Sequence, residues 1–196
     1  MASKAKAPSP ISQVRIIGGK FKRRQVSFLD IDGLRPTPDR LRETIFNWLM
    51  ADILDARVLD VCAGSGVLGF EALSRGASFV ALIEPNPKQF AQLERSAQAL
   101  NINSAQIQLI GDTAQRTLST FDKPFDVIFI DPPYALNLWQ ELLKLLIDHR
   151  LCHDHTLIYI ESNQPLDDIL TPFCATVLNA TKVGQVYASI INLSSG

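Results

Sequence analysis

Residues 57–69 read RVLDVCAGSGVLG, an apolar run followed by a glycine-rich turn. The apolar and β-branched run from Arg57 to Cys62 predicts a β-strand. The turn then carries Gly64, Gly66 and Gly69 in the G-x-G-x-x-G spacing that joins a strand to a helix in nucleotide-binding folds. Glycines at such positions let the backbone approach a bulky ligand closely.

An acidic residue completes this pattern. Glu84 stands 20 residues after Gly64, at the end of the next apolar run, residues 79–83. A carboxylate at this place can accept hydrogen bonds from both hydroxyls of a ribose. The glycines and Glu84 together predict a site for an adenosine-containing cofactor, without deciding which cofactor it is.

Strand-like and helix-like segments alternate along the rest of the chain. Alternation of this kind is typical of an α/β fold with a mostly parallel sheet and helices on both faces. Two further β-rich runs meet at Val183-Gly184 and predict a final antiparallel pair, which completes seven strands. The strands are expected at residues 57–62, 79–83, 106–110, 125–130, 156–160, 175–182 and 185–193, and the helices after the glycine turn, at 87–100, near 113 and at 137–149.

The chain divides by charge into a basic and an acidic part. Residues 1–50 carry a net charge of +6, whereas residues 51–196 carry −7. We expect a disordered tail at residues 1–13, a basic hairpin and helix at residues 14–50, and an α/β domain at residues 51–196. The asymmetry predicts an anionic partner for the basic part, with a solvated arm that binds nothing specific as the alternative.

Residues 14–26 predict a small β-hairpin, because two β-rich runs flank the turn dipeptide Gly18-Gly19. A helix is expected to follow from Pro38. Thr37 is its predicted N-cap, and Pro38 suits the first helical position.

Composition excludes several classes of protein. With 196 residues, of which 46% are hydrophobic, the chain is expected to fold around a substantial core. No apolar run approaches the roughly 20 residues of a membrane-spanning helix, and the first residues lack the apolar segment of a secretory signal. Three cysteines without C-x-x-C spacing predict reduced thiols and a cytoplasmic location. His149, Cys152 and His153 lack an evident fourth ligand, so no metal site is expected.

Residues 131–134 read Asp-Pro-Pro-Tyr and follow the apolar run 125–130. Two prolines stiffen this loop and remove two N–H donors, which leaves carbonyl groups beside a carboxylate and a phenol ring. Asp131 and the Pro132 carbonyl could hold both N–H groups of a base amine and aim its lone pair at an electrophilic methyl. Tyr134 could stack on a base turned out of its helix. Hydride transfer has no use for such a clamp.

These motifs resemble those of amino-group methyltransferases that use S-adenosylmethionine. Asp131 to Tyr134 resembles their motif IV, Asp60 to Gly66 their motif I, and Glu84 their motif II acid. Three segments near the N-terminus point to a narrower family. They look like the N-terminal signature of the ribosomal small-subunit methyltransferase D family and comprise Arg15 to Gly19, Arg35 to Thr44 and Phe46 to Leu49. The similarity extends from about Val14 to Leu193.

The resemblance implies a Rossmann-like methyltransferase domain in residues 51–196. It implies methyl transfer from S-adenosylmethionine to the exocyclic N2 of a guanine in 16S ribosomal RNA, at the position usually called 966. The small size of the basic part favours this RNA within an assembled or assembling small subunit as the substrate, and a monomer without a metal is the default expectation. The implied catalytic residues are Asp131, Pro132, Pro133 and Tyr134.

The resemblance also assigns binding residues. Glu84 would hold the ribose, Asp112 the adenine amine, and Asp60 would lie close to the methionine part. The implied cofactor-binding residues are Thr37, Arg42, Asp60, Cys62, Ala63, Gly64, Gly66, Glu84, Pro85, Asn86, Gly111, Asp112 and Thr113. The residues expected on RNA phosphates are Arg15, Lys20, Lys22, Arg23, Arg24 and Arg35.

Four other functions remain open on the sequence. The amine clamp also suits the N6 of adenine in DNA or RNA. A protein glutamine methyltransferase is a second possibility, although its loop usually opens with Asn where this chain has Asp131. A non-catalytic RNA-binding factor and a nicotinamide oxidoreductase are the remaining two. A melting assay distinguishes the oxidoreductase, because S-adenosylmethionine and not NAD should raise the melting temperature of a methyltransferase.

Overall fold

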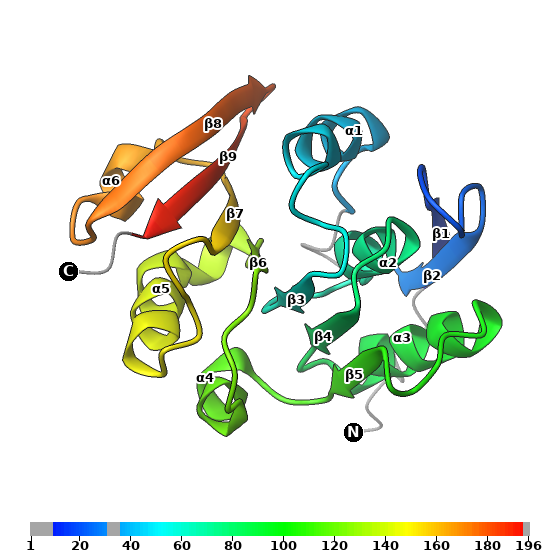
Figure 1. The fold of residues 1–196 in the computed structure, drawn as a ribbon. Helices are drawn as coiled ribbons and strands as arrows, with labels where there is room; N and C mark the ends of the chain where they lie inside the picture. The colour runs from blue at the N-terminus through cyan, green and yellow to red at the C-terminus, as the bar shows by residue number, and fades with distance from the viewer. Residues whose placement is uncertain (1–9, 31–35, 194–196) are drawn as a thin grey trace, which may run out of the picture.

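The computed structural model describes residues 10–30 and 36–193, which form a large sheet, a small hairpin and the helices around them (Figure 1). The large sheet has the strand order β5-β4-β3-β6-β7-β9-β8. Neighbours from β5 to β7 pair in parallel, whereas β9 pairs antiparallel with both β7 and β8. The strands are β3 (Arg57–Asp60), β4 (Phe79–Ile83), β5 (Ile107–Ile110), β6 (Val127–Ile130), β7 (Leu157–Ser162), β8 (Ala175–Val183) and β9 (Val186–Leu193). The predicted seven-stranded mixed sheet is therefore confirmed.

Helices cover both faces of this sheet (Figure 1). Successive residues of a strand point to opposite faces, so Val58 of β3 packs into one apolar cluster and Leu59 into the other. The first face carries α1 (Asp39–Trp48), α2 (Val67–Ser74) and α3 (Pro87–Ala99), and the second carries α4 (Ala114–Thr117), α5 (Trp139–Asp148) and α6 (Leu166–Leu170). Two short 3-10 helices are η1 (Leu118–Thr120) and η2 (Tyr134–Leu136). No helix within residues 10–30 and 36–193 is long and apolar enough to cross a membrane.

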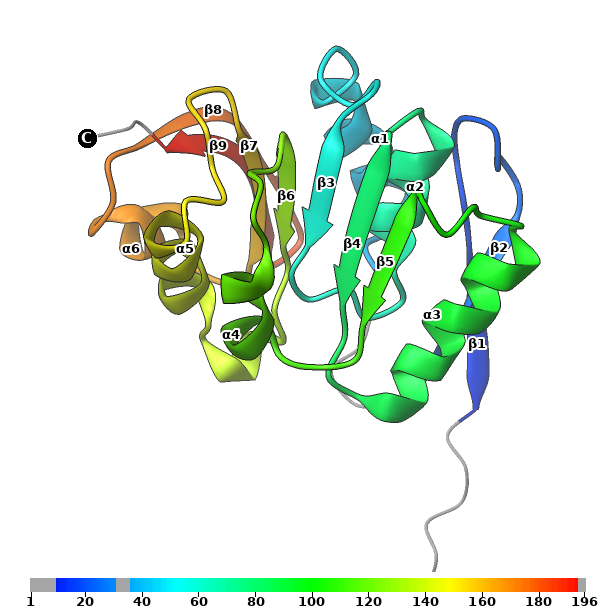
Figure 2. The ribbon, with the colours of Figure 1, turned by 60° about the horizontal axis from the view of Figure 1, so that its bottom comes forward.

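The carboxyl ends of the parallel strands meet at one edge of the sheet, which we call the carboxyl edge (Figure 2). The chain moves outward from β3 to β5 and then returns to β6 on the other side of β3. Loops on either side of such a reversal diverge and leave a crevice where ligands bind. The loops after β3 and β6, which hold the glycine turn and residues 131–134, border this crevice.

The N-terminal segment packs as part of the same core. Strands β1 (Ile11–Arg15) and β2 (Gln25–Leu29) pair antiparallel, and Ile16 and Val26 are fully buried in the cluster that also holds Val58. The predicted hairpin is therefore present. Two details of the prediction were wrong, because β1 begins at Ile11 within the expected tail and the connecting loop runs from 16 to 24.

The loop of the hairpin lies at the edge of the sheet opposite the carboxyl edge (Figure 2). The Lys20 N–H donates to the Ser74 carbonyl at 2.7 Å, and the Arg24 guanidinium donates to the Ala99 carbonyl at 2.5 Å. Ser74 and Ala99 are the last residues of α2 and α3, which both begin at the carboxyl edge. The hairpin loop is thus about 20 Å from that edge, the length of α3 at 1.5 Å per residue.

The start of α1 differs from the prediction. Pro38 is the capping residue, and no side chain caps the helix. The Thr37 hydroxyl donates instead to Glu161 Oε2 at 3.3 Å, across the fold. The helix α6 was not predicted, because five residues after Pro165 are too few to show a helical period.

Candidate active site

The turn between β3 and α2 has a backbone that only glycine adopts easily. Gly64 and Gly66 have φ angles of 52° and 72°. A Cβ on Gly66 would lie 2.6 Å from Leu93 Cδ2 and 2.8 Å from the Phe70 ring, so any side chain here would displace the core beneath the turn. The two glycines therefore keep this loop tight against α2 and α3 and leave its outer side free for a ligand.

Two buried side chains hold this turn in place. The Gly64 N–H donates to Glu84 Oε2 at 3.0 Å, and the Gly64 carbonyl accepts from Gln89 Nε2 at 2.7 Å. Gln89 Oε1 accepts from the Leu29 N–H at 2.8 Å, so this side chain also ties the end of β2 to the glycine turn. Nothing in the sequence indicated Gln89, which looks like any polar residue of an amphipathic helix.

Glu84 directly follows β4 and is nearly buried. Its second oxygen, Oε1, accepts from the Asn86 N–H at 2.7 Å. Burial raises the pKa of Glu84, although both backbone donors counteract it. Each carboxylate oxygen keeps a lone pair for a further donor, as binding of two ribose hydroxyls requires.

The other predicted cofactor residues lie on loops at the same edge. Asn86 caps α3 by accepting from the backbone of Lys88 and Gln89. Asp112 follows β5, accepts from the Thr113 N–H at 2.8 Å and pairs with Arg116 at 3.5 Å. The loops after β3, β4 and β5 thus bring together Asp60, Cys62, Ala63, Gly64, Gly66, Glu84, Pro85, Asn86, Gly111, Asp112 and Thr113.

Two carboxyl groups, one buried and one half-buried, lie at the ends of the neighbouring strands β3 and β6. Asp60 ends β3 with 2% of its surface exposed, and burial raises its pKa to about 7. Asp131 follows β6, which is hydrogen-bonded to β3, and burial raises its pKa well above the usual range, with Glu161 and then Asp60 adding repulsion. These groups favour a positively charged or amine-bearing ligand, because such a ligand offsets the cost of their ionisation.

Glu161 connects the Asp-Pro-Pro-Tyr loop to the core. Its Oε1 accepts from the Tyr134 hydroxyl at 3.1 Å, and its Oε2 accepts from the Tyr159 hydroxyl at 2.8 Å and from Thr37. Its backbone carbonyl accepts from Trp139 Nε1 at 2.8 Å. Glu161 lies near the end of β7, is 5% exposed, and has a pKa raised by burial. The sequence analysis missed this residue, although an acid within an apolar strand was a usable signal.

Arg42 is buried, and its guanidinium is engaged within the protein. It donates to the carbonyls of Thr37 and Arg15 and to Asp39 Oδ1, and it pairs with Glu71 at 3.6 Å. We therefore assign Arg42 a positioning role between the hairpin, α1 and α2, in place of the direct cofactor contact that was expected.

Four of the six residues expected on RNA phosphates lie away from the crevice. Lys20, Lys22, Arg23 and Arg24 belong to the hairpin loop at the opposite edge. Arg15 pairs with Asp39 at 2.6 Å. Arg35 lies outside the residues that the structure describes.

The crevice fits S-adenosylmethionine. The glycine turn gives the close approach that a bulky ligand needs, Glu84 keeps acceptors for a ribose, and the buried Asp60 and the half-buried Asp131 suit a cation. Among the described residues, no cluster of three His, Cys, Asp or Glu could hold a metal ion. The fold and site define a Rossmann-like methyltransferase that uses S-adenosylmethionine.

Comparison with known proteins gives the family. The family model described as conserved hypothetical protein 95 matches residues 14–192. Ribosomal RNA small subunit methyltransferase D of Haemophilus influenzae is 38% identical over 93% of this chain and 95% of its own length, and that of Escherichia coli K12 is 43% identical over 76% and 75%. The solved structure of yhhF from Escherichia coli, described as a methyltransferase, superposes with a TM-score of 0.82 at 33% identity, covering 94% of this chain and all of that one. The chain belongs to the ribosomal RNA small subunit methyltransferase D family.

Proposed function

We propose that the protein methylates the exocyclic N2 of a guanine in 16S ribosomal RNA, at the position usually called 966. The curated relatives are named for small-subunit ribosomal RNA, which supports the substrate class. The single observation that carries the target chemistry is the placement of Asp131 and Pro132 directly after β6, beside the glycine turn after β3. A base amine in this crevice would meet a carboxylate and a bare carbonyl next to the cofactor site.

When bound, S-adenosylmethionine supplies an activated methyl group, so the protein mainly has to position the amine. Asp131 and the Pro132 carbonyl accept the two N–H groups and direct the nitrogen lone pair away from them. The Tyr134 ring stacks on the guanine, and its hydrogen bond to Glu161 fixes the ring orientation. The raised pKa of Asp131 makes this carboxylate a suitable acceptor for the proton that the amine loses.

The hairpin loop has a separate part in this proposal. It lies about 20 Å from the carboxyl edge, the length of the 13-residue α3 at 1.5 Å per residue, so it contacts phosphates distant from the target base. Such contacts strengthen RNA binding and fix its orientation without selecting the base. An RNA surface that spans both edges of the sheet favours a folded or assembled particle as the substrate.

The test is transfer of a labelled methyl group to undermethylated small-subunit RNA, both naked and in particles, followed by nucleoside identification. We expect label in N2-methylguanosine, with particles as the better substrate. Label in N6-methyladenosine would retain the methyltransferase and reject the guanine assignment. No label in RNA, despite S-adenosylmethionine binding, would reject an RNA substrate and point to the glutamine or non-catalytic alternatives.

A further inference from the structure

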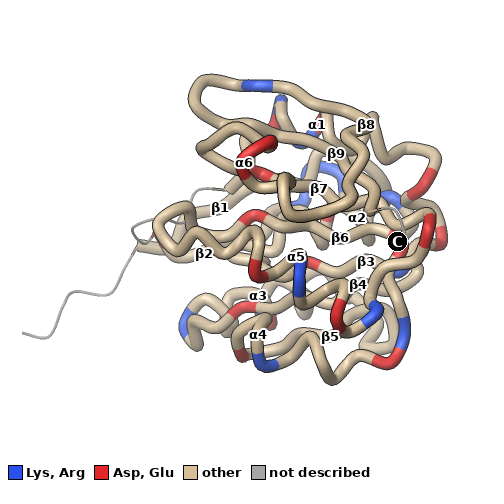
Figure 3. The backbone as a smooth tube through the Cα atoms, turned by 90° about the vertical axis from the view of Figure 1, so that its left-hand side faces the viewer, with Lys and Arg blue, Asp and Glu red and all other residues tan. Residues whose placement is uncertain are grey.

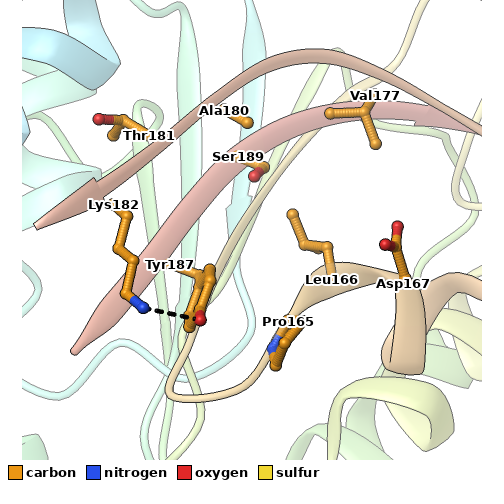
Figure 4. Close-up of a pocket in the computed structure, with 9 residues that line it drawn as sticks. All are labelled: Pro165, Leu166, Asp167, Val177, Ala180, Thr181, Lys182, Tyr187 and Ser189. Carbon is orange, nitrogen blue, oxygen red and sulfur yellow. Dashed lines mark hydrogen bonds between the residues drawn. The ribbon is translucent and has the colours of Figure 1, made fainter.

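A groove of about 360 Å³ lies between the start of α6 and the strands β8 and β9 (Figure 4). Pocket volumes of roughly 300–1,000 Å³ are usual for small-ligand sites. Pro165 and Leu166 form one wall, and Val177 and Ala180 of β8 form the other. None of these residues belongs to the crevice described above.

The groove opens at the carboxyl edge, next to the catalytic loop. Because β9 runs antiparallel to β7, Tyr187 near the start of β9 lies opposite Ser162 at the end of β7. Gln164 Nε2 donates to Asn137 Oδ1 at 3.3 Å and so joins the loop after β7 to the segment that follows Tyr134. The start of the groove at Pro165 is therefore connected, through its neighbour Gln164, to the segment that follows the Asp-Pro-Pro-Tyr loop.

A cation and an aromatic ring stand together at one end of the groove. The Lys182 ammonium donates to the Tyr187 hydroxyl at 2.8 Å and lies 4.3 Å from the centre of the ring (Figure 4). Within the described part of the chain, Lys182 forms no ion pair with a carboxylate. It is the one basic residue of β8, whereas the first turn of α6 carries the acidic residues Asp167 and Asp168 (Figure 3). Asp167 lines the groove at the end away from Lys182 (Figure 4). An anionic group would therefore bind at the Lys182 end.

A buried hydroxyl lines the floor of the groove without a partner. Ser189 is 1% exposed, and its Oγ forms no hydrogen bond with any residue in the described ranges. An unpaired buried hydroxyl is unfavourable, and a polar atom of a ligand in the groove would satisfy it. This observation is independent of the charge of Lys182 and indicates that the groove is built to hold something.

We propose that this groove binds a nucleotide of the RNA strand next to the target guanine. Its phosphate lies at Lys182, its base packs against the apolar walls, and a polar atom of its base or ribose pairs with Ser189. This inference rests on the proposed function, since it assumes an RNA substrate. It gives RNA a contact at the carboxyl edge, where the basic hairpin loop does not reach.

The first experiment measures RNA affinity with three groove variants and one control. Lys182→Ala should weaken binding of undermethylated 16S RNA about 3- to 10-fold at 0.15 M salt and lower the salt slope by about 1, as the loss of one phosphate contact predicts. Lys182→Arg should retain most of the affinity. Ala180→Trp, at an exposed position of β8, should weaken binding by filling the groove. Lys123→Ala removes an exposed charge that does not line the groove and should change nothing.

A further groove variant, at Ser189, separates ligand binding from a structural role. Ser189→Ala should leave the melting temperature unchanged or raise it, because it removes an unpaired buried hydroxyl, yet it should weaken RNA binding. The affinity for S-adenosylmethionine should be the same in all these variants. Photo-crosslinking with thiouridine-substituted RNA should attach a nucleotide flanking the target to the segment that contains Tyr187.

The results that would overturn this inference differ from those that would reject the function. If the wild-type protein methylates RNA while Lys182→Ala and Ala180→Trp bind and methylate it normally, the groove is not an RNA site. If these variants lose activity on particles but bind naked RNA normally, the groove serves a ribosomal protein, and the nucleotide assignment is wrong. Absence of RNA methylation by the wild-type protein would reject the proposed function itself.

Discussion

The hydroxyl of Tyr134 lies 3.1 Å from Oε1 of Glu161, so the aromatic residue of the Asp-Pro-Pro-Tyr loop is hydrogen-bonded to the neighbouring strand β7. The same carboxylate accepts from Tyr159 and Thr37. One buried acid thus links the loop after β6, the sheet and the segment that leads into α1. Its loss should affect catalysis through the position of Tyr134.

Replacing Glu161 tests this link. Glu161→Ala leaves three buried or half-buried hydroxyls without their acceptor, which should lower the free energy of unfolding by about 1–3 kcal/mol. In this variant we expect kcat to fall by a larger factor than the affinity for S-adenosylmethionine. Glu161→Gln keeps one carbonyl oxygen as an acceptor and should recover part of the lost kcat. Glu141→Gln on the exposed face of α5 is the matched control. Equal effects of the Ala and Gln variants on kcat would contradict a positioning role.

Asp131 should separate catalysis from cofactor binding. Asp131→Ala removes one acceptor for the amine, and we expect kcat to fall roughly 10²–10³-fold, as for other residues that stabilise a transition state directly. The dissociation constant for S-adenosylmethionine, measured by calorimetry, should change by less than about threefold. A parallel loss of binding and turnover would show that Asp131 holds the cofactor and not the amine.

The buried Asp60 makes stability depend on pH. Its pKa is about 7 in the folded protein, against a usual value of 3.8, so the folded state holds this proton more tightly than the unfolded chain. The free energy of unfolding should therefore fall as pH rises from about 4 to about 7, and this contribution should be constant at higher pH.

Urea unfolding at pH 5 and pH 8, without cofactor, measures the effect. Asp60→Asn cannot ionise, so the stability of this variant should fall less between the two pH values than that of the wild-type protein. Asp52→Asn, at an exposed position, should leave the difference unchanged. The same pH dependence in the wild-type and Asp60→Asn proteins would show that Asp60 is not responsible.

The hairpin loop should affect RNA binding and not the chemical step. We expect Lys22→Ala combined with Arg23→Asn to lower RNA affinity and to reduce the salt slope by about 2, while kcat at saturating RNA stays the same. Asn is chosen because Arg23 has a φ of 71°, which Asn tolerates. A fall in kcat at saturating RNA would mean that this loop reaches the carboxyl edge in the complex.

The sequence predicted the elements of the sheet well because their signals are local. The apolar run at residues 79–83 is a strand with the predicted bounds, and the other predicted strands are present with ends that differ by one or two residues. The glycine turn lies where the spacing placed it. The structure also places Glu84 against this turn, where its Oε2 accepts from the Gly64 N–H, a contact that the spacing did not predict.

Relationships between distant elements could not be predicted in this way. Gln89 became recognisable only when the fold placed it beside Gly64. An acid within an apolar strand marked Glu161 as unusual, but its contact with Tyr134 became evident only in the structure. The family resemblance implied a place at the cofactor for Arg42, whereas tertiary packing turns it toward Glu71 and Asp39. The position of the hairpin loop depends on its contacts with Ser74 and Ala99. The sequence of the loop does not predict these contacts.

The side chain of Gln89 connects the hairpin, a proposed RNA contact, with the turn that borders the cofactor site. It accepts from Leu29 at the end of the hairpin and donates to Gly64 in the turn that borders the cofactor site. Displacement of β2 from α3 would break the first of these hydrogen bonds and free the side chain that makes the second. In the proposed function, RNA on the hairpin and cofactor at the turn would therefore both favour the same arrangement of Gln89. We expect any coupling through this side chain to be reciprocal, so that each ligand changes the affinity of the other by the same factor.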